Sequence, residues 1–297
     1  MALLLCSVMV PLQAAELTLV RFGDPGQERP GLIDAEGRIR DLSAHIDDIS
    51  PAQLSDARLA MLAAVPVDTL PVVDAETRLG VPVTGSRKIL AIGFNYVDHA
   101  AEMAVDVPDE PMVFSKAISA LNGPFDDVVS PRGATKLDYE AELVVVIGKR
   151  AKYVSEEEAM EHVAGYSVGH DVSERAFQRE RGGQFVKGKS ADTFAPFGPW
   201  LVTRDSIADV QDLAVWSEVN GERRQQGNTS QMVFGVAHLV SHLSQFMTLE
   251  PGDLIYTGTP EGVGDGMDPP RYLQPGDTVR IGIDDLGVQE QRIVPAQ

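Results

Sequence analysis

Residues 138–147 read DYEAELVVVI, and most of the expected fold and function follows from this stretch. Successive side chains on a strand point to opposite faces, so a strand here places Glu140 and Glu142 on the same face. The aliphatic run that follows indicates a strand that enters a core. Two like charges repel, and burial strengthens the repulsion unless a cation neutralises them. We therefore expect a metal ion at this pair; the alternative is an exposed strand face on which both carboxylates are solvated.

Asp171 is the third candidate ligand for such an ion. It directly follows an expected strand at 164–170, where the chain is expected to pass into a helix that starts near Ser173. A hard cation such as Mg²⁺ prefers carboxylate oxygens and keeps some of its waters, so about three carboxylates on a rigid frame suit it. The sequence therefore predicts a divalent-cation site made by Glu140, Glu142 and Asp171.

His99 and Glu102 form a second pair of candidate functional residues. They are spaced i, i+3 in a segment that we expect to be helical, so their side chains can meet. A carboxylate beside an imidazole fixes the tautomer of the ring and raises its basicity, which suits a pair that activates water. The alternative is a partly exposed histidine on an amphipathic helix.

Two further stretches can contribute to an anion-binding pocket. Residues 187–194 read KGKSADTF and place a lysine in a glycine-flanked loop. Residues 256–264 read YTGTPEGVG, a glycine-rich loop after an expected strand, which can offer backbone amides and a hydroxyl to a carboxylate.

The composition limits the possible partners. The 297 residues include 25 Lys and Arg against 44 Asp and Glu, a formal net charge of −19. Such a field repels phosphate backbones and anionic lipid surfaces, so we expect neither nucleic acid nor a membrane as a partner. The basic cluster between Arg175 and Lys189 therefore suggests a small anionic substrate. The single cysteine, Cys6, excludes a disulfide framework and a cysteine-based metal site.

The chain divides into three expected regions. Residues 1–16 are a leader or a disordered start: the apolar run resembles a secretory signal, but no Lys or Arg precedes it and it contains Pro11. We therefore favour a frayed or mis-assigned start and a cytoplasmic location. Residues 17–82 form a small β-rich N-terminal domain, and residues 83–297 form the main domain.

The pattern along the main domain favours an α+β roll or barrel over a doubly wound sheet, because strands dominate and crossover helices are few. Two Pro-Gly-Asp sequences, at 251–253 and 275–277, suit tight turns. The expected strands are 88–92, 111–116, a β-rich stretch over 128–147, and 164–170; the expected helices lie around 95–102, 155–162 and 232–246.

Five motifs in a fixed order carry a family resemblance. NYxDHxxE, DYExEL, GHDVSER, KGKSxDTFxPxGP and TGTPxGVG extend from Asn95 to Gly264. In this order they resemble the fumarylacetoacetate hydrolase family, whose fold is a mainly-β roll. The N-terminal module also resembles the leading domain of the bacterial single-function members. These include acylpyruvate hydrolases, diketo-deoxy-sugar-acid hydrolases and proteins labelled ureidoglycolate lyases, which the chain resembles most closely.

The resemblance implies a role for each matching residue. Mg²⁺ or Mn²⁺ would be bound by Glu140, Glu142 and Asp171, and would chelate the two oxygens of a 2-oxo acid. The other implied roles are water activation from a lid by His99 and Glu102, stabilisation of an oxyanion or enolate by Lys189, and substrate binding by Arg175, Gln178 and Thr259. Two positions, at Phe94-Asn95 and Ser115-Lys116, depart from many relatives.

The implied reaction is hydrolysis of a carbon-carbon bond in a 2,4-dioxo acid, giving a 2-oxo acid and a carboxylic acid. The same metal and lysine could instead serve decarboxylation, hydroxymuconate-type isomerisation or lyase chemistry. A catalytically silent metal-binding protein is a third possibility. Members of this family are commonly homodimers, and we expect one here.

Two other patterns are interpreted as structural. Residues 165–169 read GYSVG and match the nucleophile elbow of α/β-hydrolases, but Ser167 falls within an expected strand that follows a helix, whereas the elbow requires a helix directly after the serine. His238 and His242 are spaced i, i+4, but they lie in an apolar helix without the glutamate of the metalloprotease motif.

Overall fold

The computed structural model describes residues 17–296. The predicted leader, residues 1–16, lies outside this range. Within the described range, no helix is both long enough and apolar enough to cross a membrane.

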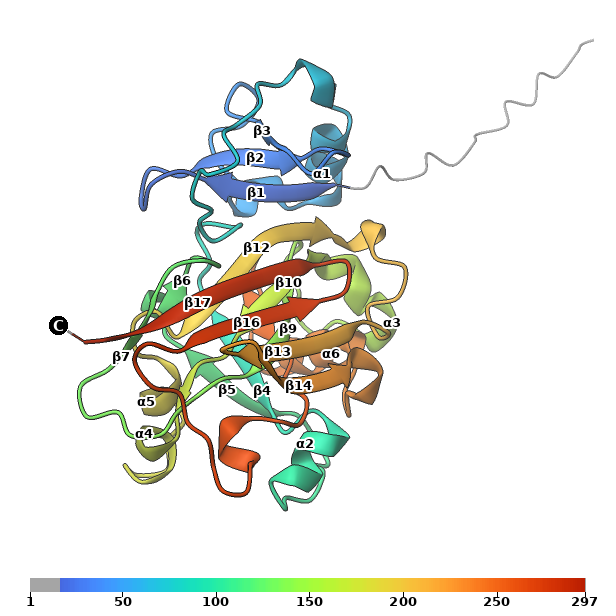
Figure 1. The fold of residues 1–297 in the computed structure, drawn as a ribbon. Coiled ribbons are helices and arrows are strands. Elements are labelled where there is room, and N and C mark those ends of the chain that lie inside the picture. Colours follow the sequence, from blue (N-terminus) through green and yellow to red (C-terminus); the bar gives the residue numbers. More distant parts are fainter. Residues whose placement is uncertain (1–16, 297) are drawn as a thin grey trace, which may run out of the picture.

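One ten-stranded sheet forms the main layer of the fold (Figure 1). Its strands are β1 (Thr18–Phe22), β2 (Arg29–Ile33), β3 (Ile39–Asp41), β4 (Ile89–Gly93), β5 (Met112–Lys116), β6 (Leu121–Asn122), β9 (Ala141–Ile147), β10 (Val163–His170), β12 (Ala195–Thr203) and β15 (Leu254–Tyr256). The order is β3-β2-β1-β12-β10-β9-β15-β4-β5, and β6 pairs with β12. Pairing is antiparallel except between β15 and β4 and between β12 and β6.

A second, five-stranded sheet lies across β9, β10 and β12 of the first (Figure 1). It runs in the order β14 (Glu222–Asn228), β13 (Ala214–Val219), β16 (Thr278–Ile283), β17 (Gly287–Pro295) and β7 (Val128–Ser130). Fully buried residues such as Val168 and Ile281 belong to one shared apolar core. Burial of this surface is the main favourable term in folding. The prediction of an α+β, mainly-β roll is confirmed.

The N-terminal segment joins the main sheet. Strand β1 pairs with β12, with Thr18 opposite Val202. The segment also contains the helix α1 (Asp56–Ala63) and the short 3-10 helices η1 (Pro51–Gln53) and η2 (Val67–Thr69). Strands from both parts of the chain thus share one sheet, while the separate domains 17–82 and 83–297 remain a prediction.

The remaining helices are short and lie mostly at the edges of the sheets (Figure 1). The α-helices are α2 (Val97–Glu102), α3 (Glu156–Ala159), α4 (Arg175–Arg179), α5 (Val186–Lys189) and α6 (Val236–Phe246). The 3-10 helices are η3 (Ile118–Ala120), η4 (Met160–His162), η5 (Arg204–Ser206), η6 (Thr229–Gln231) and η7 (Gly264–Gly266).

Three local predictions were wrong. The expected single strand over 138–147 is interrupted after β8 (Leu137–Asp138), because β8 pairs with β11 (Ser173–Glu174) instead of continuing into β9. For the same reason the helix expected near Ser173 begins only at Arg175, where the Glu174 side chain accepts a hydrogen bond from the Ala176 backbone N–H at 3.0 Å. Lys189 ends helix α5 and does not lie in a loop.

Asn95 fixes the position of α2 and of the glycine-rich loop. It is fully buried, and its Nδ2 donates to the carbonyl of Thr257 at 2.8 Å and to that of Phe234 at 3.0 Å. Its Oδ1 accepts from the Phe234 N–H at 2.9 Å. One amide therefore connects the start of α2, the loop after β15 and the approach to α6.

Asn95→Ala should lower the free energy of unfolding by about 2–4 kcal/mol, because it leaves buried backbone groups without partners. Urea unfolding of both proteins measures this difference. The control Asn122→Ala removes an exposed hydrogen bond to the Asp127 carbonyl and a long one, 3.4 Å, to the Asp126 carbonyl, so its loss should stay below about 1 kcal/mol. Equal losses in the two variants would contradict the role given to Asn95.

Candidate active site

The three predicted metal-binding carboxylates meet where β9 and β10 lie side by side. In this antiparallel pair Gly169 lies opposite Glu142, and the Asp171 N–H donates to the carbonyl of Glu140 at 3.0 Å. One oxygen from each of Glu140, Glu142 and Asp171 lies within 4.8 Å of the others, and all three residues are buried. The register of the two strands thus brings together residues that lie up to 31 positions apart in the sequence.

Buried cations neutralise two of these carboxylates. Glu140 accepts from Lys189 Nζ and from Arg175 Nη2, both at 2.6 Å. Asp171 forms ion pairs with Lys116 and, at 2.7 Å, with Lys189. Burial alone would raise the pKa of Glu140, but the charges of Lys189 and Arg175 outweigh burial and lower it. Burial alone would lower the pKa of Lys189, but the negative charges of Asp171 and Glu140 outweigh burial and raise it, so its amino group is charged at neutral pH.

Glu142 is the carboxylate without such compensation. Its side chain accepts a hydrogen bond from the Gly258 N–H at 2.8 Å, and within residues 17–296 no cationic side chain forms an ion pair with it. Burial, together with the charges of Asp171 and Glu140, raises its pKa well above the usual value. A dication that shares all three carboxylates would supply the missing positive charge. The donor set therefore fits a hard divalent cation.

Gly258 must be glycine for this hydrogen bond to form. Its φ is +100°, which disfavours other residues, and a Cβ atom there would lie 2.8 Å from Cβ of Asn95. The loop after β15 therefore approaches Asn95 closely enough to point a backbone amide at Glu142.

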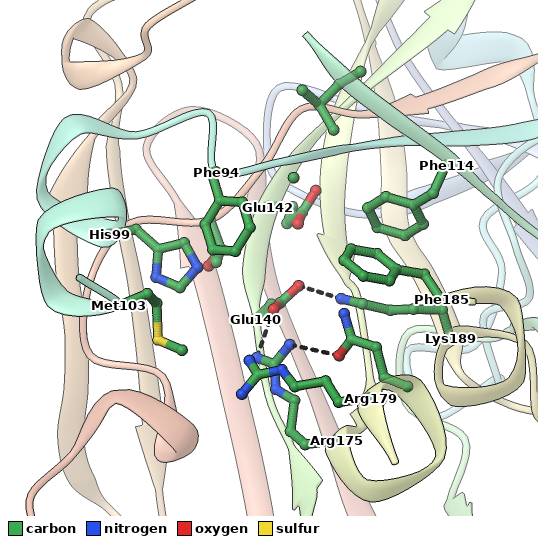
Figure 2. A pocket seen from close by; sticks show the side chains of 14 residues that line it. Phe94, His99, Met103, Phe114, Glu140, Glu142, Arg175, Arg179, Phe185 and Lys189 are labelled. Carbon is green, nitrogen blue, oxygen red and sulfur yellow. Dashed lines mark hydrogen bonds and ion pairs between the residues drawn. The ribbon is translucent and has the colours of Figure 1, made fainter. Parts of the chain in front are cut away.

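The predicted pairing of His99 with Glu102 is present in α2. His99 Nδ1 lies 3.1 Å from Glu102 Oε2, and Glu102 Oε1 accepts from the Gly262 N–H at 2.8 Å. The ring stacks on Phe94 with centroids 5.7 Å apart. In Figure 2 the His99 ring is directed into the pocket that also contains Glu140. Because Nδ1 faces a carboxylate, Nε2 is the nitrogen available for proton transfer.

The three predicted substrate-binding residues line the same pocket. Two of them, Arg175 and Thr259, already donate hydrogen bonds to other residues of the protein. Arg175 donates to Asp138 at 2.8 Å and to Glu140 at 2.6 Å, so it holds both carboxylates in place. Thr259 Oγ1 donates to the Ala141 carbonyl at 2.9 Å. Gln178 uses its Oε1 to accept from Arg175 at 3.2 Å, which leaves its amide N–H groups for a ligand.

Four candidate functional residues were not predicted from the sequence. Lys116 was noted only as a departure from relatives, yet it is buried against Asp171. Asp138 opens the quoted stretch and pairs with Arg175, and Gln225 donates to Thr259 at 2.7 Å. Arg179 lines the pocket. Spacing could not reveal these contacts, because each joins separate elements.

The pocket has two kinds of wall. Its volume is about 460 Å³ including the open mouth. Its charged wall includes Glu140, Glu142, Arg175 and Lys189. Its apolar wall consists mainly of four large side chains, Phe94, Met103, Phe114 and Phe185 (Figure 2). A ligand can therefore place polar atoms against the base and an apolar segment between the sides.

The two patterns interpreted as structural have no link to this pocket. Ser167 lies in the middle of β10, is buried, and donates to the Trp200 carbonyl at 2.6 Å. On α6, His238 lies 3.1 Å from Glu156 and stacks against His242.

The sequence also matches a known family. The family described as "Fumarylacetoacetate (FAA) hydrolase C-terminal" matches residues 88–294, more than half of the chain. The chain belongs to the fumarylacetoacetate hydrolase family. The resemblance based on the five motifs is therefore confirmed, and the described pocket lies within the matched region.

Relatives span almost the whole chain. A Burkholderia cenocepacia protein, provisionally named a hydrolase, is 55% identical over 282 residues, 95% of this chain and 100% of the relative. The structure of a fumarylacetoacetate hydrolase from Exiguobacterium antarcticum is 38% identical with a TM-score of 0.84, covering 94% of this chain and 100% of that one.

Other solved members of the family have different activities. A maleylpyruvate hydrolase from Sphingobium sp. SYK-6, in complex with manganese(II) and pyruvate, is 32% identical with a TM-score of 0.79; 94% of this chain and 100% of that chain are covered. A 5-carboxymethyl-2-hydroxymuconate delta-isomerase from Mycobacterium smegmatis is 32% identical with a TM-score of 0.74, and the coverage is 94% and 99%. The fold thus occurs in both hydrolases and isomerases.

Glu142→Gln should stabilise the metal-free protein at neutral pH. It should also lower the affinity for the metal by more than roughly 10- to 100-fold, the loss typical of residues that only orient metal ligands. In the folded protein the pKa of Glu142 is raised. Its contribution to stability is therefore fully present below about pH 4.5, falls as the pH rises, and is lost once the pH passes the raised pKa.

The advantage of Glu142→Gln over the wild type should accordingly grow with pH. Thermal unfolding in chelator across pH 4–8 and calorimetric titration with Mn²⁺ measure the two effects. Glu157→Gln, at an exposed position of α3, is the matched control and should change neither. A destabilised metal-free Glu142→Gln protein would argue against an uncompensated charge at this position.

Proposed function

We propose that this protein is a divalent-metal-dependent hydrolase that cleaves the carbon-carbon bond of a 2,4-dioxo acid, releasing a 2-oxo acid and a carboxylic acid. The observation that carries the proposal is one pocket lined by His99, Lys189 and two buried carboxylates, Glu140 and Glu142. Glu102 lies beside His99, and Asp171 lies beside the two carboxylates. A water-activating base and a cation site are the two elements that such a hydrolysis requires.

Glu140, Glu142 and Asp171 would hold Mg²⁺ or Mn²⁺. The bound ion would polarise the 2-oxo group and provide a sink for negative charge. The manganese in the related maleylpyruvate hydrolase supports this assignment, as does the excess negative charge at Glu142.

His99 would act as the base. With Nδ1 held by Glu102, Nε2 removes a proton from water while the water oxygen bonds to the C4 carbonyl carbon. The C3–C4 bond then breaks, and its electron pair stays on C3 as the enolate of the 2-oxo acid. The proton from His99 returns to C3, so the products differ from the substrate by one water.

The remaining residues would orient and stabilise. The Lys189 ammonium lies at the base of the pocket and places positive charge beside the oxygens that become negative. The free N–H groups of Gln178 can donate to a substrate oxygen. Arg175 acts indirectly, because it aligns Glu140.

A second candidate is isomerisation or decarboxylation of a 2-oxo acid at the same site. The related isomerase supports it, since an isomerase with this fold exists. Both reactions need the metal and Lys189 but no attacking water, so the function of His99 distinguishes them from hydrolysis.

His99→Ala should lower the hydrolysis of acylpyruvates by about 10²–10⁴-fold, the usual contribution of a general base. Metal-dependent decarboxylation of oxaloacetate should remain within a few-fold of wild type. The measurement is a steady-state assay with acylpyruvates, fumarylpyruvate, diketo-deoxy sugar acids and oxaloacetate, with Mg²⁺ and with chelator. His45→Ala, in the exposed part of the N-terminal segment, is the control.

Two outcomes would reject the proposal. If the wild type converts none of the 2,4-dioxo acids when metal is restored, hydrolysis is rejected. Turnover of oxaloacetate would then favour the isomerase or decarboxylase function, and its absence would favour a catalytically silent metal-binding protein. If His99→Ala retains hydrolysis at the wild-type rate, His99 is not the base.

A further inference from the structure

A second group of side chains that can bind a metal lies on α6, and its members do not line the pocket. His238 and His242 are spaced i, i+4 on this helix, so their side chains lie on the same face, one turn apart. Two histidines at this spacing can bind one zinc ion together, as they do in the metalloprotease motif. The missing glutamate of that motif argues against protease chemistry, but both imidazole ligands are present.

The two imidazoles are close enough to share an ion after a small movement. Their ring centroids are 6.0 Å apart, and their planes are inclined by only 17°. A tetrahedral zinc ion about 2.1 Å from one nitrogen of each ring requires centroids roughly 5 Å apart, so the rings need to approach by only about 1 Å. Both side chains are only partly buried, and that of His238 is 38% exposed, so this rotation is possible and an ion can reach the rings from solvent.

Glu156 orients His238 for metal binding. It belongs to α3, which packs against α6 (Figure 1), and its Oε2 lies 3.1 Å from His238 Nδ1. A metal-bound histidine commonly donates its other N–H to a carboxylate, which fixes the tautomer and the direction of the ring. With Nδ1 protonated and facing Glu156, Nε2 of His238 carries the lone pair that can bind a metal.

His242 also offers a lone pair at neutral pH. Burial lowers the pKa of His242 below its usual value, an effect that the Glu110 carboxylate opposes and the neighbouring His238 reinforces. A ring with a lowered pKa is neutral at pH 7, which is the form that binds a metal.

Aromatic neighbours restrict both rings. Phe234 stacks on His238 with centroids 5.1 Å apart, and the Phe246 ring lies 4.9 Å from that of His242. The opposite face of α6 is anchored in the apolar core, where Leu243 is fully buried. Because the helix is fixed and the rings are restricted, little conformational freedom is lost when they bind an ion.

We propose that His238 and His242 form a second metal site, which binds a borderline transition-metal ion such as Zn²⁺ at the surface of α6. Imidazole nitrogens suit zinc, copper and nickel, whereas carboxylate oxygens suit Mg²⁺ and Mn²⁺. The two sites of the protein therefore differ in the ions that they prefer. This inference does not depend on the proposed hydrolytic function.

The test is calorimetric titration of the full chain with Zn²⁺ in the presence of excess Mg²⁺, which occupies the carboxylate site. The proteins are wild type, His238→Gln, His242→Gln, Glu156→Gln and Glu157→Gln. Glu157 is the matched control, because it is exposed on α3 and directly follows Glu156 in the sequence. Electron paramagnetic resonance of the Cu²⁺-loaded proteins counts the nitrogen ligands.

Each histidine variant should bind Zn²⁺ more than about 100-fold more weakly than wild type, because a ligand is lost and not merely a residue that orients one. Their copper spectra should show one nitrogen fewer than that of wild type. Glu156→Gln should weaken binding by about 10-fold with the nitrogen count unchanged, and Glu157→Gln should stay within about twofold of wild type. All variants should unfold at similar temperatures in chelator, because these side chains are partly or fully exposed.

Two results would overturn the inference. If Glu142→Gln abolishes all Zn²⁺ binding, the ion binds only at the carboxylate site. If both histidine variants bind Zn²⁺ as tightly as wild type, His238 and His242 are not its ligands. Failure of the proposed function is distinguishable from either result, because it appears in the assay with 2,4-dioxo acids and leaves Zn²⁺ binding to α6 unchanged.

Discussion

Mutual repulsion among three buried carboxylates is the constraint on which this site depends. Glu140 and Asp171 are stabilised by lysine and arginine side chains from other elements, but Glu142 has a backbone amide and a raised pKa. A folded protein tolerates such a group when a ligand compensates it. Lys116 and Lys189 compensate Asp171 and Glu140, and the remaining negative charge suits a dication.

The loop after β15 connects the parts of the site. Its backbone N–H groups bind Glu142 through Gly258, Glu102 through Gly262 and Asp138 through Gly264. One segment thus positions a carboxylate of the proposed metal site, the partner of the proposed base, and Asp138, which pairs with Arg175. Because backbone amides carry no side-chain flexibility, the relative positions of these groups are fixed by the fold.

Sequence reasoning found what is encoded locally. Alternation placed Glu140 and Glu142 together, and helical spacing placed His99 next to Glu102. It missed the ion pair of Lys116 with Asp171, because that contact joins β5 to the end of β10 and no spacing rule relates the two. The interruption of the expected strand at 138–147 was also not predictable, since it follows from pairing between β8 and β11. Local patterns therefore identified candidate site residues, whereas tertiary contacts determine which cations compensate the buried carboxylates.

Anomalous scattering from crystals soaked in Mn²⁺ would show whether Glu140, Glu142 and Asp171 share one cation. We expect one manganese peak per chain, about 2.1 Å from an oxygen of each of these residues. The Glu142 side chain should still accept the Gly258 hydrogen bond in the loaded protein. Absence of a peak between these carboxylates at saturating Mn²⁺, or a peak bound by other residues, would contradict the proposed metal site.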